Sequence, residues 1–154
     1  MTNLPKESIY IIWAVGLGLI SFIVIDRERY RKLFPYGLIA GFLFATLFIG
    51  FMIATNGFHY KNFGALHYRG VPVFIAVAWI PAIMLFLHFL PRLGSWEYFL
   101  YLLSWVLMSM MIQHGFELLY LLDTGWFNEP LRLVFSLIWF YIVSYWYSNS
   151  YFDV

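Results

Sequence analysis

The chain has 154 residues, of which 63% are hydrophobic, 23% are aromatic and only 11% are charged, and its formal net charge is +1. Soluble domains are about a quarter charged and less than half apolar, so this composition excludes an ordinary soluble domain and predicts an integral membrane protein. The small net charge argues against nucleic acid as a partner, because no basic stripe could follow a phosphate backbone. The absence of cysteine excludes thiolate catalysis and cysteine-ligated metals.

Apolar stretches follow one another along the whole chain, each near the ~17–25 residues that a helix needs to cross the hydrocarbon of a bilayer. They show no alternation of period two, so helices rather than strands are expected. The sequence therefore predicts an all-α fold, a single integral membrane bundle of about five transmembrane helices over residues 8–25, 34–55, 71–90, 96–122 and 131–147. The last stretch is short and rich in aromatic residues, and it is the weakest of the five as a span.

A cluster of basic residues separates the first two stretches and sets the expected orientation. Arg27, Arg29, Arg31 and Lys32 lie directly beside both spans. Basic residues in short loops favour the cytoplasmic side, so we expect this loop to be cytoplasmic. The charged run also resembles a stop-transfer pattern, which predicts a retained first span. A multi-pass protein of the cell membrane is expected, with its N-terminus outside and its C-terminus cytoplasmic.

The second stretch contains small residues at four-residue spacing, namely Gly37, Gly41 and Ala45. At this spacing they share one face of a helix, where the backbone of another helix can approach closely. We expect this face to pack against another helix of the same chain rather than to form a dimer interface. Pro35 suits the start of this helix, because a missing N–H costs little there.

A stripe of polar residues lies within the fourth stretch. Ser109, Gln113, Glu117, Tyr120 and Thr124 share one helical face, with His114 at its edge. Ionisable groups at membrane depth are costly and usually face a protein interior or a wet cavity. The intramembrane cluster Ser109, Gln113, His114, Glu117 and Tyr120 is therefore the candidate functional site.

The expected topology places further polar groups on the same outer side. His59 and His67 lie in the longest loop, and Arg132 lies at the start of the last stretch. His114 and Glu117, at helical spacing i and i+3, could bind a metal ion or relay a proton. A hydrogen-bonded packing network of Gln113, His114 and Glu117, with Arg132 as a further partner, is preferred over a metal site, because only one ligand pair is visible and the stronger metalloprotease and di-iron motifs are absent.

The remaining motifs exclude several functional classes. His88 and His114 are expected at different membrane depths, so they do not predict a bis-histidine haem. No nucleophile elbow, phosphate-binding loop, kinase signature or paired carboxylate motif occurs, so an enzyme is the less favoured class and no cofactor is predicted.

The junction from Asp26-Arg27 to Pro35-Tyr36, with a basic run before Phe34-Pro35-Tyr36-Gly37, resembles a group of small multi-pass membrane proteins of endospore-forming Gram-positive bacteria. The resemblance covers most of the chain and implies a bacterial inner-membrane setting. It implies no activity and no site.

The sequence therefore predicts a small accessory or solute-handling component of a membrane. Its expected partners are the lipid bilayer and either further copies of itself or a larger membrane complex. Two alternatives use the polar stripe: a membrane-embedded enzyme or metal-dependent site that acts on a lipid or small apolar molecule through His114 and Glu117, and a proton- or ion-coupled transport component in which Glu117 titrates.

Overall fold

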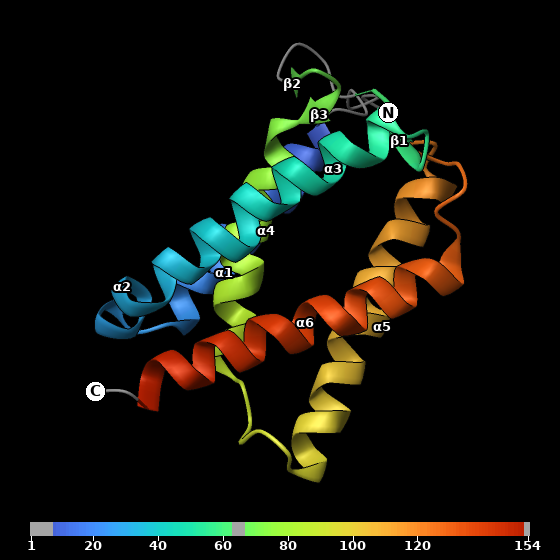
Figure 1. Ribbon diagram of the computed structural model, residues 1–154. Coiled ribbons are helices and arrows are strands. Elements are labelled where there is room, and N and C mark those ends of the chain that lie inside the picture. Colours follow the sequence, from blue (N-terminus) through green and yellow to red (C-terminus); the bar gives the residue numbers. More distant parts are fainter. Residues whose placement is uncertain (1–7, 63–66, 153–154) are drawn as a thin grey trace.

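The computed structural model describes residues 8–62 and 67–152, and the chain in these ranges is predominantly helical, which confirms the all-α prediction (Figure 1). The helical elements are α1 (Ser8–Val24), α2 (Arg27–Tyr36), the π-helical segment η1 (Gly37–Leu43), α3 (Phe44–Ala54), α4 (Val73–His88), α5 (Trp96–Leu118) and α6 (Glu129–Phe152). Short strands join them: β1 (Phe58–Tyr60), β2 (His67–Tyr68), β3 (Val71–Pro72) and β4 (Leu122–Thr124).

The number of helices long enough to span a membrane is smaller than predicted. Within the described ranges, three are long and apolar enough, at Arg27–Ala54, Trp96–Leu118 and Glu129–Ser150, which indicates a membrane protein. The helices α1, with 17 residues, and α4, with 16 residues, are shorter than the roughly 20 residues of a usual span. The predicted span at 71–90 is wrong at both ends, because Val71 and Pro72 belong to β3 and the helix ends at His88.

The second apolar stretch begins earlier than predicted, because the charged run before it is helical. Asp26 caps α2, its side chain accepting a hydrogen bond of 3.0 Å from the backbone N–H of Arg29. Pro35 therefore lies inside a continuous helix rather than at its start, and the π-helical η1 follows directly. A proline removes one backbone donor, and a π-helical turn is a local change of hydrogen-bond register that can accommodate such a loss.

The last two predicted spans also differ in length from the structure. The helix α5 ends at Leu118, so the predicted stretch 96–122 extends past it into β4. The helix α6 has 24 residues, so the stretch expected to be the weakest span belongs to a helix longer than predicted. Polar residues near its C-terminal end, such as Ser148 and Asn149, weaken the hydropathy signal without ending the helix.

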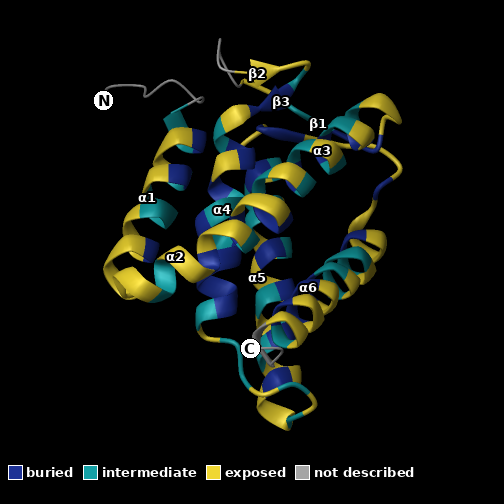
Figure 2. Ribbon diagram, turned by 60° about the vertical axis from the view of Figure 1, so that its left-hand side comes forward, coloured by how far each residue is buried: buried dark blue, intermediate teal, exposed yellow. Residues whose placement is uncertain are grey.

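The core lies around α4. Apolar side chains of α4 such as Ile83, Met84, Phe86 and Leu87 are fully buried, as expected of a helix that is hydrophobic all round. The outer faces of α1, α3, α5 and α6 instead expose large apolar side chains, as the burial colours of Figure 2 show. Exposed apolar surface on this scale indicates a membrane or protein partner.

The strands gather at one end of the bundle, which we call the strand-bearing end (residues 55–62, 67–72 and 117–129; Figure 1). Antiparallel pairing joins β1 to β4, with His59 opposite Asp123, and joins β2 to β3. The turn between β2 and β3 has positive φ at both Arg69 (50°) and Gly70 (83°), as a type I′ hairpin turn requires. This end ties together helices that are distant in sequence.

Candidate functional site

The end of α5 positions Glu117 through a reversal of the chain. Tyr120 adopts a left-handed conformation (φ 56°), its N–H bonds to the carbonyl of Glu117, and the N–H of Leu121 bonds to the carbonyl of Phe116. These two bonds form a Schellman motif, in which glycine is usual at the position of Tyr120. Phe116 and Leu121 are both buried beside it. The sequence lacks the glycine signal, which explains why the helix was expected to continue to residue 122.

An ion pair between α5 and α6 forms the centre of the site. Nη1 of Arg132 lies 2.5 Å from Oε1 of Glu117, and Nε of Arg132 donates to the carbonyl of Phe127 at 3.0 Å. The hydroxyl of Thr124 donates to the same Glu117 oxygen at 3.1 Å. Arg132 is only 4% exposed, so the carboxylate neutralises a buried cation. The structure thus brings Arg132 and Glu117 together as the packing interpretation proposed.

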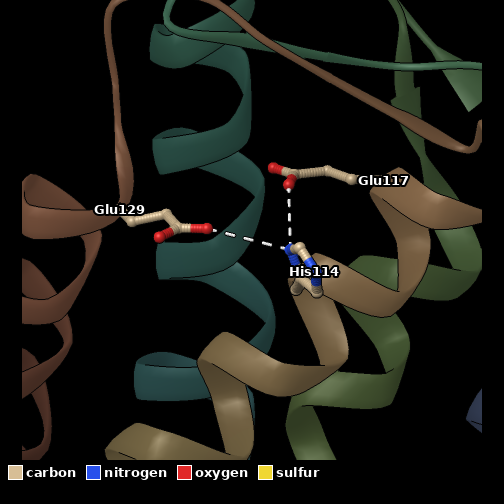
Figure 3. A group of neighbouring side chains, drawn as sticks. All are labelled: His114, Glu117 and Glu129. Carbon is tan, nitrogen blue, oxygen red and sulfur yellow. Dashed lines mark ion pairs between the residues drawn. The ribbon is translucent and has the colours of Figure 1, made fainter.

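Three side chains, those of His114, Glu117 and Glu129, lie close together next to this ion pair (Figure 3). Nδ1 of His114 lies 3.6 Å from Oε2 of Glu117 and 3.8 Å from Oε1 of Glu129. Glu129 is the first residue of α6, whereas His114 and Glu117 belong to the last turns of α5. The ligand atoms of all three lie within 4.8 Å of one another. We call these three residues the His114 cluster.

The other predicted site residues do not join this cluster. The side chain of Tyr120 is 74% exposed, and its backbone carbonyl accepts a hydrogen bond from Asn62. The ring of His59 contacts the side chain of Asn56 at 3.2 Å, and His67 lies on β2, paired with β3. Among the described residues, the possible metal ligands around His114 are Glu117 and Glu129, and the grouping of one or both loop histidines with His114 stays a prediction.

Ser109 and Gln113 instead line a partly open cavity of about 150 Å³. Ser109 is buried, and its hydroxyl donates to the carbonyl of Val106 in its own helix. The wall is mostly aromatic and aliphatic, with a few polar side chains, including Tyr60, Arg132 and Ser136. Arg132 therefore lies between two environments, because it lines the cavity and also holds Glu117 of the His114 cluster.

Tyr60 contributes a neutral hydroxyl group to this wall from β1. Burial raises the pKa of Tyr60 above its ordinary value, and the nearby positive charge of Arg132 opposes that effect. Since burial dominates, Tyr60 keeps its proton at neutral pH. The cavity therefore combines a neutral phenol, a carboxamide, hydroxyls and one guanidinium group within an apolar lining.

Sequence reasoning missed two contributors, Glu129 and Tyr60. Glu129 precedes Pro130 in a loop that looks unrelated to α5, and only the folding of α6 back along α5 brings its carboxylate near His114. Tyr60 gives no signal among the many aromatic residues of the chain. Pairing of β1 with β4 places Tyr60 opposite Leu122, close to the end of α5.

No protein-family model, curated protein or solved structure matches this chain. The chemistry of the site is therefore interpreted from its own geometry. An apolar cavity with few polar groups can hold a small apolar molecule, and the His114 cluster can hold a cation.

Proposed function

We propose that this chain is an integral membrane protein that binds a small apolar molecule carrying one hydrogen-bond acceptor, as a solute-handling component of its membrane. The observation that carries the proposal is the cavity of about 150 Å³ between the helices, apolar except for a few convergent polar groups. Binding sites for small molecules commonly have this composition. A cavity of about 150 Å³ with an apolar lining is large enough for a molecule of the size of benzene.

Rings from three parts of the chain give the cavity its shape. Phe44 of α3 stacks on Trp139 of α6 with ring centroids 3.5 Å apart, and Phe48 stacks on Phe135 of α6 at 4.2 Å. Trp105 of α5 contacts Phe140 of α6 at 6.1 Å. Flat rings packed in this way favour an aromatic or otherwise planar guest.

The polar groups favour a guest that accepts a hydrogen bond. Among the described residues, Arg132 contacts the carbonyl of Phe127 through Nε and the carboxylate of Glu117 through Nη1. A guanidinium group has five N–H donors, so these two contacts leave donors for a guest. Tyr60 keeps its hydroxyl proton and lines the same space. Glu117 already neutralises the charge of Arg132, so a neutral carbonyl or hydroxyl suits the site better than an anion.

Binding can be tested with a matched pair of small probes, 4-fluoroacetophenone and 4-fluorotoluene. The first has a carbonyl acceptor and the second does not. We expect ¹⁹F NMR of the full-length protein in lipid nanodiscs to show saturable binding of both, with the ketone about tenfold tighter, since a hydrogen bond to a charged donor contributes about 1.5 kcal/mol. Empty nanodiscs measure partition into the lipid alone.

A substitution that fills the cavity separates specific binding from adsorption. Ser109→Leu adds volume at the cavity wall, whereas Ser104→Leu adds the same volume on the exposed face of the same helix. Saturable binding should be lost in the first variant and unchanged in the second. Equal binding by both variants would contradict the proposal.

The proposed topology has five crossings, with the N-terminus outside and the C-terminus cytoplasmic. The five crossings are supported by the positions of the strands at one end of the bundle and of the α4–α5 turn and the C-terminal end of α6 towards the other (Figures 1 and 2). The orientation is supported by the basic residues Arg27, Arg29, Arg31 and Lys32 at the start of α2. The short α4 can cross with the others because its neighbours, rather than lipid, surround it. Reporter fusions after residue 154 that are active on only one side of the membrane test this arrangement, and an extracytoplasmic C-terminus would contradict it.

A bacterial inner-membrane setting and assembly with further copies or with a larger complex belong to the same proposal. The exposed apolar faces support a membrane or protein partner but do not choose between them. Size measurement in a mild detergent tests the assembly, and a monomer alone would contradict it. Enzymatic action on a lipid and ion-coupled transport through Glu117 stay predictions, and unchanged turnover or transport in Glu117→Gln would contradict either.

A further inference from the structure

We propose that the His114 cluster is a binding site for a divalent metal ion, best suited to Zn²⁺, formed by Nδ1 of His114, Oε2 of Glu117 and Oε1 of Glu129 (Figure 3). One imidazole and two carboxylates are donors that zinc accepts, and three protein ligands with one open position are typical of sites that keep a bound water molecule. This inference does not depend on what occupies the cavity of about 150 Å³.

The distances in the cluster suit an ion between the three groups. Zinc binds histidine nitrogen and carboxylate oxygen at about 2.0–2.2 Å in tetrahedral geometry, so its ligand atoms lie about 3.4 Å apart. The imidazole nitrogen lies 3.6 Å and 3.8 Å from the two carboxylate oxygens. All three ligand atoms lie within 4.8 Å of one another, so side-chain movements of about an ångström or less bring them to the tetrahedral spacing, and the exposed side chains of His114 and Glu129 can make them.

The same distances argue against a simple hydrogen-bonded pair. An N–H···O hydrogen bond is about 2.7–3.2 Å long, so neither contact of Nδ1 is one. A single nitrogen atom faces two carboxylates that belong to different helices, and it bonds to neither at that length. The groups therefore converge on a common point without satisfying one another.

A second layer of contacts holds Glu117 in place. Its Oε1 atom is engaged by buried Arg132 and by the hydroxyl of Thr124, and its Oε2 atom faces His114. Partners that orient a ligating carboxylate in this way are a regular feature of metal sites. Arg132 also limits the negative charge of the cluster, which favours a site that exchanges its ion over a permanent structural one.

Calorimetric titration of the purified, metal-free, full-length protein with ZnCl₂ in detergent tests the site directly. We expect one Zn²⁺ per chain. Removing a residue that only orients a metal ligand typically weakens metal binding about tenfold or more, and removing the ligand itself should weaken it at least as much. We therefore expect His114→Gln and Glu129→Gln each to lower the affinity for Zn²⁺ about tenfold or more. Both side chains are more than half exposed, so neither variant should unfold the protein.

Two control variants make the same substitutions, His to Gln and Glu to Gln, at residues outside the His114 cluster. His67→Gln removes an exposed histidine on β2, and Glu97→Gln removes an exposed carboxylate in the first turn of α5. Neither should change the affinity for Zn²⁺. Absence of binding by the native chain, or an equal loss in His67→Gln and His114→Gln, would overturn the proposal.

A spectroscopic measurement checks the geometry independently of affinity. Co²⁺ in place of Zn²⁺ absorbs strongly in the visible region when it is tetrahedral and only weakly when it is octahedral, as it is in water. The native protein should develop the strong absorption, and Glu129→Gln should lose it while Glu97→Gln retains it. A weak octahedral spectrum in the native protein would overturn the proposed three-ligand site.

Discussion

The strand-bearing end and the contact between η1 and α4 hold the bundle together in opposite ways. At the strand-bearing end, helices are joined by polar groups such as the Arg132–Glu117 ion pair, and by the hydroxyl of Tyr10, which lies 2.7 Å from the carbonyl of Lys61. The contact between η1 and α4 instead depends on the close approach of their two backbones at small residues. A methyl group on Gly41 would lie 2.7 Å from the carbonyl carbon of Trp79, and one on Gly37 would lie 2.8 Å from the carbonyl oxygen of Ile80.

The difference between packing of small residues and packing of aromatic rings explains the position of the cavity. Small residues let the backbones of η1 and α4 meet without a gap, as expected of a small-residue face within a bilayer. Stacked rings such as Phe44 and Trp139 instead join α3 to α6 and hold their backbones apart. The cavity lies between these two kinds of contact and is bordered by Gly41 on one side and Arg132 on the other.

The largest effect should come from breaking the ion pair at the strand-bearing end. Glu117→Gln leaves the positive charge of Arg132 buried without its counterion, which should cost about 3 kcal/mol of unfolding free energy. Glu129→Gln, an exposed carboxylate of the same cluster, should cost far less in metal-free buffer. Thermal unfolding in detergent measures both, and equal stability of the two variants would show that the ion pair does not hold this end.

The second largest effect should come from disturbing the close packing of η1 against α4. Gly41→Ala places a methyl group against the backbone of α4, so the helices must separate, at a cost of about 2 kcal/mol. Gly50→Ala, further along the same continuous helix, meets no atom within 4 Å and should be neutral or stabilising by about 0.5 kcal/mol. The same unfolding assay compares them. Similar behaviour of the two variants would contradict the close approach of η1 and α4.

A smaller effect is expected where α1 meets the strand-bearing end. The hydroxyl of Tyr10, which is 2% exposed, lies 2.7 Å and 2.8 Å from the carbonyls of Lys61 and Leu121. Tyr10→Phe should therefore cost about 1 kcal/mol, the usual net contribution of one hydrogen bond. Tyr145→Phe, on an exposed face of α6, should change nothing. Hydrogen exchange of the amides in β1 and β4 should rise only in the first variant.

The smallest effect concerns the surface ion pair between Lys61, which directly follows β1, and Asp123 of β4. Lys61 and Asp123 are 2.6 Å apart, but both side chains are at least half exposed. Lys61→Met should cost about 0.5 kcal/mol, and high salt should abolish the difference from the native chain, because exposed charges are screened. A loss of more than about 2 kcal/mol would mean that this pair is shielded from solvent.

How far prediction from the sequence succeeded depends on whether a property is local. Gly37 and Gly41 were identified as a packing face because helical spacing alone puts them together, and both lie against α4. Glu117 was identified because a carboxylate in an apolar helix needs a partner, and Arg132 is that partner. The helix ends were predicted poorly, since Pro35 continues a helix through a π-helical segment and Tyr120 ends one without glycine.

The amino-acid sequence by itself determined that this protein is helical and apolar, and that its polar groups gather near the end of α5, because composition and periodicity are properties of neighbouring residues. Only the tertiary structure decided that Glu129 faces His114, that His59 contacts Asn56, and that Arg132 borders a cavity. These outcomes depend on the angle at which α6 returns along α5 and on the pairing of β1 with β4. Contacts between segments far apart in the chain set both, and no local pattern encodes them.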